Sequence, residues 1–122
     1  MNLSLRKRIR SFGYAFNGLR LMLMTQRNAQ IHAGAAAVAV ALGVLCDLSR
    51  VEWAVLVLTI AAVWAAEALN TAFEALCDVA SPGVHPQVKR AKDIAAGAVL
   101  VCAIAAVAVA ALILAPKLLA MM

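Results

Sequence analysis

The sequence predicts an all-α membrane protein with one amphipathic surface helix and three transmembrane helices. Composition is the first observation: 66% of the 122 residues are hydrophobic, only 14% are charged, and mean hydropathy is +0.93. A soluble domain of this size cannot bury so much apolar surface, so lipid must be part of its solvent. The second observation is that the apolar residues gather in long stretches separated by short polar segments. The length predicts a single domain over residues 1–122.

Residues 3–25 are predicted to form the surface helix. Basic side chains are mixed there with aromatic and aliphatic ones, in the stretch LSLRKRIRSFGYAFNGLRLMLM. This mixture is typical of an amphipathic helix in the membrane interface, with arginines towards phosphate and aromatics towards acyl chains. Because membrane spans follow these cations, anionic lipid headgroups are the expected partner, rather than nucleic acid. The alternative is a basic segment that serves only as a topology anchor.

Three apolar stretches are predicted to span the membrane, over about residues 31–48, 52–78 and 90–115. A transmembrane helix needs roughly 20 apolar residues, and a chain in lipid must satisfy its backbone hydrogen bonds internally. The segment Ser81-Pro82-Gly83, with Pro86, is predicted to break the helix after the second span.

Charges in the connecting segments predict the orientation of the chain. Residues 47–52 carry one cation and two carboxylates, whereas the 78–93 loop carries Lys89, Arg90 and Lys92. The positive-inside rule therefore places the N-terminus and the 78–93 loop in the cytoplasm.

The second span ends in a stripe of polar side chains. At about 100° per residue, four of them fall within an arc of roughly 80°: Glu67, Asn70, Glu74 and Asp78. A hydrocarbon core of about 30 Å that begins near Trp53 would end near residue 73, so Glu67 lies close to the cytoplasmic interface. An ionisable group at that depth is costly unless it faces protein or a wet cleft, so it indicates a functional site. The alternative is that Glu67 is a packing residue neutralised by a neighbouring Lys or Arg.

The stripe favours phosphoryl transfer at a membrane surface. Two carboxylates and an amide can hold Mg²⁺, a hard cation that usually arrives with nucleotide phosphates. Lys92, at the start of the third span, could neutralise phosphate charge, and the deepest carboxylate could take a proton from a lipid hydroxyl. The sequence contains neither a P-loop nor the protein-kinase signature set. A small ion-coupled transporter and a non-catalytic membrane scaffold are the alternatives.

The stretch EALNTAFEALCDVASPGVHPQVKRAKDIAAGAVL (67–100) resembles the prokaryotic diacylglycerol kinase family of small membrane lipid kinases, which includes undecaprenol kinases. The shared pattern is E-x-x-N-[ST]-A-x-E-x-x-x-D, then His, then A-K-D-x-[GA]-[SA]-x-A-V, and GYAFNGLR (13–20) and RNAQIH (27–32) also match. The resemblance implies ATP- and Mg²⁺-dependent phosphorylation of a membrane lipid hydroxyl, on diacylglycerol or undecaprenol. It also implies a homotrimer with shared sites in the bacterial inner membrane.

The resemblance further implies roles for individual residues. Glu67 matches the catalytic base that deprotonates the lipid hydroxyl, and Glu74 matches a carboxylate that binds Mg²⁺ on the nucleotide. Asn70 and Lys92 match phosphate contacts. The remaining matches are Asp93, His85 and Tyr14 at the nucleotide site, Lys7 as a basic group there, Arg20 near the lipid substrate, and Asp78 in a supporting role.

Gln26 departs from the family pattern, which often has a second metal-binding Glu at this position. An amide oxygen can bind Mg²⁺ but contributes no charge. We therefore expect weaker metal binding at Gln26 and greater reliance on Glu74.

Overall fold

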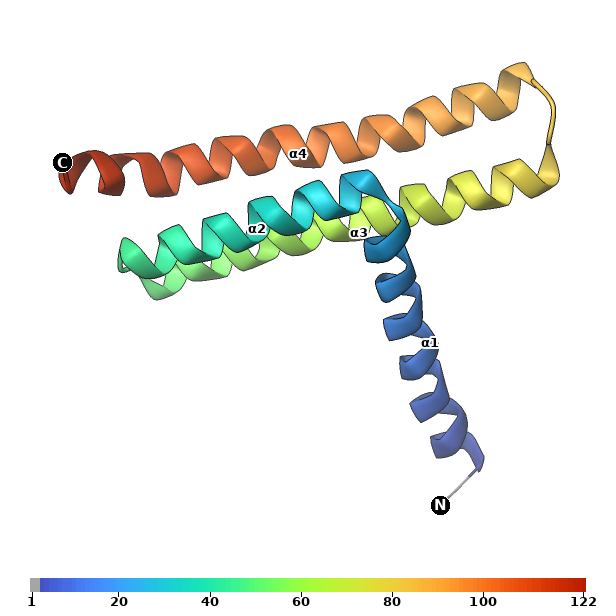
Figure 1. The fold of residues 1–122 in the computed structure, drawn as a ribbon, viewed down its shortest axis with the longest axis horizontal. Coiled ribbons are helices and arrows are strands. Elements are labelled where there is room, and N and C mark those ends of the chain that lie inside the picture. The colour runs from blue at the N-terminus through green and yellow to red at the C-terminus, as the bar shows by residue number, and fades with distance from the viewer. Residues whose placement is uncertain (1–2) are drawn as a thin grey trace.

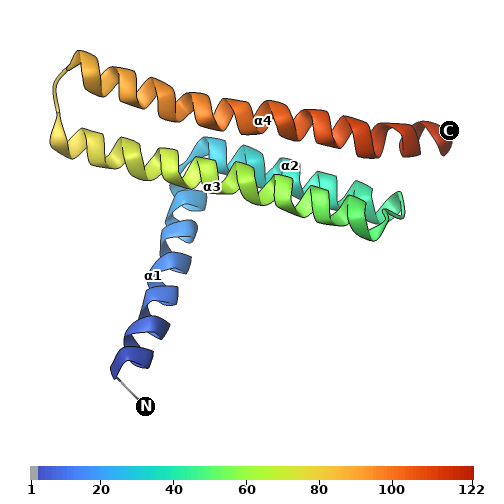
Figure 2. The ribbon, with the colours of Figure 1, turned by 180° about the vertical axis from the view of Figure 1, so that it is seen from behind.

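The computed structural model describes residues 3–122, and regular structure within that range is entirely helical. The helices are α1 (Leu3–Thr25), α2 (Arg27–Leu45), α3 (Arg50–Ala80) and α4 (Pro86–Ala120). Helices α2, α3 and α4 lie side by side, whereas α1 points away from them (Figure 1). The view from behind shows the same arrangement (Figure 2). The predicted all-helical fold is confirmed.

Helices α2, α3 and α4 are each long and apolar enough to cross a membrane. Most of their large apolar side chains are exposed in the single chain. An apolar surface of this extent requires lipid or another protein chain against it. The three predicted spans therefore agree with three helices of suitable length and composition. The surface location of α1 and the homotrimer stay predictions.

The turn between α2 and α3 is built by local hydrogen bonds. Helix α2 ends at Leu45, before the predicted end of the first span at Leu48, because Asp47 has a left-handed backbone with φ of 54°. Ser49 then caps α3: its hydroxyl accepts from the backbone N–H of Glu52, and the Glu52 carboxylate accepts from the backbone N–H of Ser49. This capping box satisfies two backbone donors that the helix leaves unpaired.

A small core lies near this turn, at the far end from the polar stripe. Its buried members come from the turn, α3 and α4: Cys46, Leu48, Leu56 and Leu114. Gly43 is buried beside them, and a Cβ atom there would lie 2.8 Å from Cη2 of Trp53 and 3.0 Å from Cδ1 of Leu48. The absence of a side chain at Gly43 lets α2 approach the indole ring of α3.

Substituting Gly43 by alanine should destabilise the fold by about 1–3 kcal/mol, the usual cost of overpacking a core. The indole of Trp53 is rigid, so the helices must separate to make room. The measurement is the free energy of unfolding in mixed detergent. Gly34→Ala is the matched control in the same helix, because nothing lies within 4 Å of a Cβ atom at that position. Equal stability of the two variants would contradict the prediction.

Helices α3 and α4 form the most extensive contact in the fold. Helix α3 ends at Ala80, and α4 begins at Pro86, whose lack of an N–H suits the first helical position. At the opposite end, Lys117 Nζ lies 2.9 Å from Glu52 Oε1 and so joins the end of α4 to the start of α3. Helix α3 also runs beyond the start of α2, towards the α3–α4 turn (Figure 1). The last turns of α3 therefore have α4, and not α2, beside them.

Candidate functional site

Burial of the polar stripe falls along α3 towards the turn. Glu67 is 3% exposed and Asn70 is 8% exposed, Glu74 is half-buried, and the Asp78 side chain is 70% exposed. Helix α2 contributes to the burial of the first of these, because His32 of α2 contacts Glu67. Glu67 is therefore the most buried carboxylate of the stripe.

Two buried oxygens of the stripe are unsatisfied. Within residues 3–122, Glu67 Oε2 and Asn70 Oδ1 have no hydrogen-bond partner. Leaving a buried polar atom unpaired costs roughly 1–3 kcal/mol, and more when the group is charged. Such a cost is usually retained where a ligand or reaction uses the group. Both atoms belong to residues that the sequence singled out.

The nearest charged or titratable partner of Glu67 is an imidazole. His32 Nε2 lies 3.7 Å from Glu67 Oε2. The alternative in which a Lys or Arg neutralises Glu67 therefore does not describe this contact. We assigned no role to His32 from the sequence, although it lies in the RNAQIH match. The available signal was a lone imidazole in an otherwise uncharged stretch of α2, between Arg27 and Asp47.

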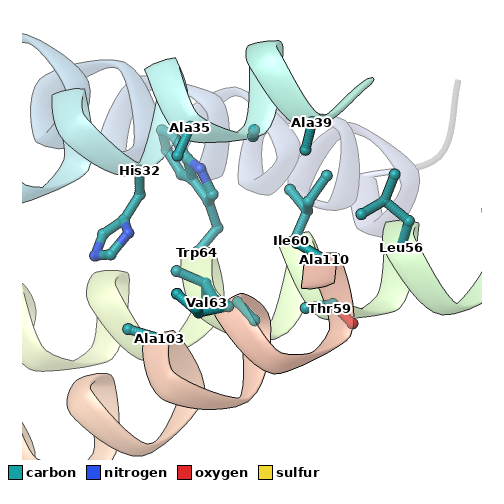
Figure 3. A pocket seen from close by; sticks show the side chains of 13 residues that line it. His32, Ala35, Ala39, Leu56, Thr59, Ile60, Val63, Trp64, Ala103 and Ala110 are labelled. Carbon is teal, nitrogen blue, oxygen red and sulfur yellow. The ribbon is translucent and has the colours of Figure 1, made fainter. Parts of the chain in front are cut away.

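An apolar groove of about 220 Å³ lies between α2, α3 and α4 (Figure 3). Its walls are mostly alanine and valine, and it extends from Ala39 and Leu56 at one end to His32 and Val63 at the other. Glu67 follows Val63 by one helical turn on α3. The apolar groove therefore leads towards the buried carboxylate.

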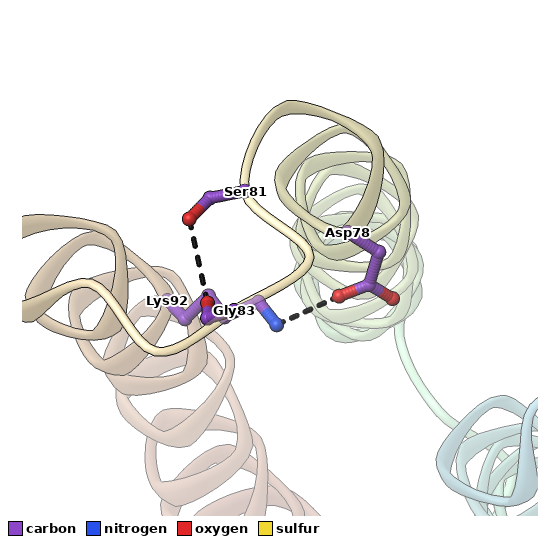
Figure 4. Close-up of polar contacts among 4 residues, drawn as sticks. All are labelled: Asp78, Ser81, Gly83 and Lys92. Carbon is purple, nitrogen blue, oxygen red and sulfur yellow. Dashed lines mark hydrogen bonds and ion pairs between the residues drawn. The ribbon is translucent and has the colours of Figure 1, made fainter.

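Beyond Glu74, the α3–α4 hairpin is closed by an ion pair. Lys92 Nζ donates to Asp78 Oδ1 at 2.9 Å, beside the turn in which the Ser81 hydroxyl donates to the carbonyl of Gly83 (Figure 4). Lys92 thus faces α3. Its neighbour Asp93 instead accepts from Lys89 Nζ at 2.7 Å, within α4.

Within residues 3–122, the remaining predicted site residues form no hydrogen bond or ion pair with the stripe. Lys7, Tyr14 and Arg20 are exposed on α1, the helix that points away from the bundle. His85 is exposed and caps α4, with Nδ1 accepting from the backbone N–H of Gln87 at 3.2 Å. Gln26 is half-buried at the start of α2, where its side chain donates to Thr25 Oγ1 at 3.3 Å.

The donors that are present fit Mg²⁺ carried by a nucleotide better than a metal held by protein alone. Within residues 3–122, no group of three or more His, Cys, Asp or Glu side chains could hold a metal ion. Magnesium is usually bound by one or two carboxylates, with water and substrate phosphates completing its shell. Glu74 and the unsatisfied Asn70 oxygen, one turn apart on α3, are suitable donors.

Known proteins that are similar to this chain carry the names of lipid kinases. The family model for prokaryotic diacylglycerol kinase matches residues 13–114. The undecaprenol kinase of Bacillus subtilis (strain 168) is 41% identical over 109 residues, which cover 89% of each chain. The diacylglycerol kinase of Synechocystis sp. (strain ATCC 27184 / PCC 6803 / Kazusa) is 42% identical over 113 residues, which cover 92% of this chain and 65% of the relative. The chain belongs to the prokaryotic diacylglycerol kinase family.

Proposed function

We propose that this protein is a lipid kinase that transfers a phosphoryl group from ATP to the hydroxyl of a membrane lipid, with Mg²⁺ as cofactor. The family and the names of the two relatives support the lipid kinase activity. The observation that carries the proposal is the position of Glu67, a buried carboxylate. It lies between the apolar groove and the end of the α3–α4 hairpin that carries Glu74, Asp78 and Lys92, called the polar hairpin below. Such a position suits a reaction between a lipid and a water-soluble nucleotide.

Glu67 acts as the general base in this mechanism. A lipid chain lying in the apolar groove would bring its headgroup towards His32 and Glu67. The carboxylate then accepts the hydroxyl proton as the oxygen attacks the terminal phosphorus of ATP. The bond from that phosphorus to the bridging oxygen breaks, and ADP leaves. General-base catalysis of this kind contributes about 10²–10⁴-fold to a rate.

The polar hairpin binds the nucleotide. Lys92 compensates the phosphate charge once it exchanges Asp78 for a phosphate oxygen, and the Asn70 side chain contacts a phosphate. Glu74 would hold Mg²⁺, which would neutralise charge on the phosphates. Positioning and charge stabilisation supply most of the rate in phosphoryl transfer. Asp93 and His85 lie on the same hairpin and line the nucleotide site, with Asp78 in support.

The complete site requires more than one copy of the chain. Lys7 and Tyr14, proposed at the nucleotide, and Arg20, proposed at the lipid, are exposed on α1, the helix that points away from the bundle. A homotrimer, in which α1 of one subunit reaches the stripe of another, would bring them there. We place this trimer in the bacterial inner membrane, with the N-terminus and the 78–93 loop in the cytoplasm.

The identity of the lipid that accepts the phosphoryl group is tested by supplying diacylglycerol and undecaprenol separately. Purified protein in vesicles receives ATP, Mg²⁺ and either diacylglycerol or undecaprenol, and phosphorylated lipid is measured. The proposal expects product from one or both lipids, and none when Mg²⁺ is chelated. ATP-independent movement of ions or solutes across the vesicle membrane, without phosphorylated lipid, would favour the transporter alternative instead.

Replacing Gln26 by glutamate should lower the Mg²⁺ concentration for half-maximal activity by about tenfold, since a second carboxylate adds charge to the metal site. The N-terminus of α2 also favours a negative side chain at this position. The measurement is a Mg²⁺ titration at saturating lipid. Gln30→Glu, one turn further along α2, is the matched control. It adds the same charge at an exposed position and, like Gln26→Glu, removes one side-chain donor, here the donor to the Leu23 carbonyl. An unchanged Mg²⁺ requirement in Gln26→Glu would place this residue outside the metal site.

A further inference from the structure

His32 is the titratable residue that contacts the Glu67 carboxylate. The two side chains come from α2 and α3, and within residues 3–122 the carboxylate's one ion-pair contact is with this imidazole. The His32 side chain is 22% exposed, whereas that of Glu67 is 3% exposed. His32 also lines the end of the apolar groove nearest to Glu67. It therefore lies between the proposed path of the lipid and the proposed base.

The His32–Glu67 contact is slightly too long to be a hydrogen bond. The 3.7 Å between Nε2 and Oε2 exceeds hydrogen-bond length, and a small rotation of either side chain would close it. Hydrogen bonds of catalytic groups are often long until the substrate is bound. Glu67 Oε2 needs a donor, and an imidazole N–H can supply one.

We propose that His32 is a positioning residue of the reaction: its imidazole donates to Glu67 Oε2 and holds the carboxylate in the orientation that receives the lipid hydroxyl. This inference rests on the proposed function. A donor on one oxygen fixes the plane of the carboxylate and leaves the other oxygen for the substrate proton. An unsupported carboxylate would sample several orientations, few of which align with the hydroxyl.

A purely structural role for His32 makes a different prediction. If the side chain only fills space between α2 and α3, then a residue of similar volume should replace it whether or not it can donate a hydrogen bond. If it positions Glu67, the replacement must be a donor. His32→Leu and His32→Gln separate these cases, because only glutamine retains an N–H donor.

The contact itself is tested by NMR of the full chain in lipid vesicles, with ¹⁵N-labelled histidine. The chain has 2 histidines, so the His32 signal is assigned by its loss in His32→Gln. We expect Glu67→Gln to shift the His32 ring nitrogens, and Glu74→Gln to leave them unchanged. Absence of a shift in Glu67→Gln overturns the proposal. This readout does not depend on catalysis.

Steady-state kinetics test whether the orientation of Glu67 by His32 contributes to turnover. We expect His32→Leu to lower kcat by about 10–100-fold, the usual effect of removing a group that orients a reacting residue, with the KM for ATP within about twofold. His32→Gln should recover most of that loss. Equal losses in the two variants, or full activity of His32→Leu, overturn the proposal. If the wild-type protein phosphorylates neither lipid, the proposed function fails, and the NMR shift alone decides whether His32 holds Glu67.

Discussion

Replacing Glu67 by glutamine should lower kcat for lipid phosphorylation by about 10²–10⁴-fold, the contribution expected of a general base. The amide has nearly the same size as the carboxylate but cannot accept the hydroxyl proton. Substrate binding should change much less, because the polar hairpin that is proposed to bind ATP is left intact. The measurement is phosphoryl transfer to lipid in vesicles, with kcat and KM for ATP determined separately.

The same substitution should leave the fold at least as stable as before. Glu67 is 3% exposed and its Oε2 lacks a hydrogen-bond partner within residues 3–122. A buried carboxylate without a full set of partners opposes folding, so neutralising it removes a cost. Loss of activity together with retained stability is typical of a functional residue rather than a packing residue.

Asp47→Asn is the matched control for Glu67→Gln. It makes the same chemical change at an exposed position in the turn at the other end of α3, and asparagine tolerates the left-handed backbone at φ of 54°. Its turnover should equal that of the wild type. Normal turnover of Glu67→Gln would remove Glu67 from the mechanism, and loss in both variants would indicate a general effect on the fold.

The parts of this fold that depend on local sequence could be predicted. Long apolar stretches predict transmembrane helices, because a single segment in lipid can satisfy its backbone hydrogen bonds internally only as a helix. The shared face of Glu67 and Asn70 follows from helical periodicity, and the structure buries both. The α3–α4 turn likewise follows from Pro82, Gly83 and Pro86.

Contacts between helices could not be predicted in the same way. The approach of His32 to Glu67 depends on how far α2 runs beside α3, and the apolar surfaces of both helices allow several registers. The helix end at Leu45 depends on the backbone of Asp47, which the apolar pattern did not indicate. The position of α1 relative to the stripe is harder still, because a complete site is proposed to need neighbouring subunits.

Replacing Lys92 by methionine should lower kcat by about 10²–10³-fold, the usual effect of removing one group that stabilises charge in a transition state. Methionine keeps the length and apolar character of the lysine stem but removes the ammonium group. The developing charge on the transferred phosphoryl group then loses a cation that the hairpin would supply. The measurement is kcat at saturating ATP and Mg²⁺, with the free energy of unfolding determined alongside.

The alternative explanation is that Lys92 only holds α3 against α4 through Asp78. Their 2.9 Å contact is solvent-accessible, with side chains that are 36% and 70% exposed. Exposed ion pairs contribute about 0–1 kcal/mol, which is too little to unfold the hairpin or to account for a loss of 10²-fold or more. Stability of Lys92→Met should therefore stay close to that of the wild type.

Asp78→Asn distinguishes a role of the Lys92–Asp78 ion pair from a role of the Lys92 ammonium group itself. It weakens the same contact but leaves the Lys92 ammonium group free to meet the phosphates, so the loss in kcat should be about tenfold at most, in line with the small value of an exposed pair. If Asp78→Asn were as slow as Lys92→Met, the ion pair itself would be the essential feature, and the proposed contact between Lys92 and phosphate would be wrong. A large loss in Lys92→Met alone would mean that the ammonium group acts on the nucleotide and not through its ion pair with Asp78.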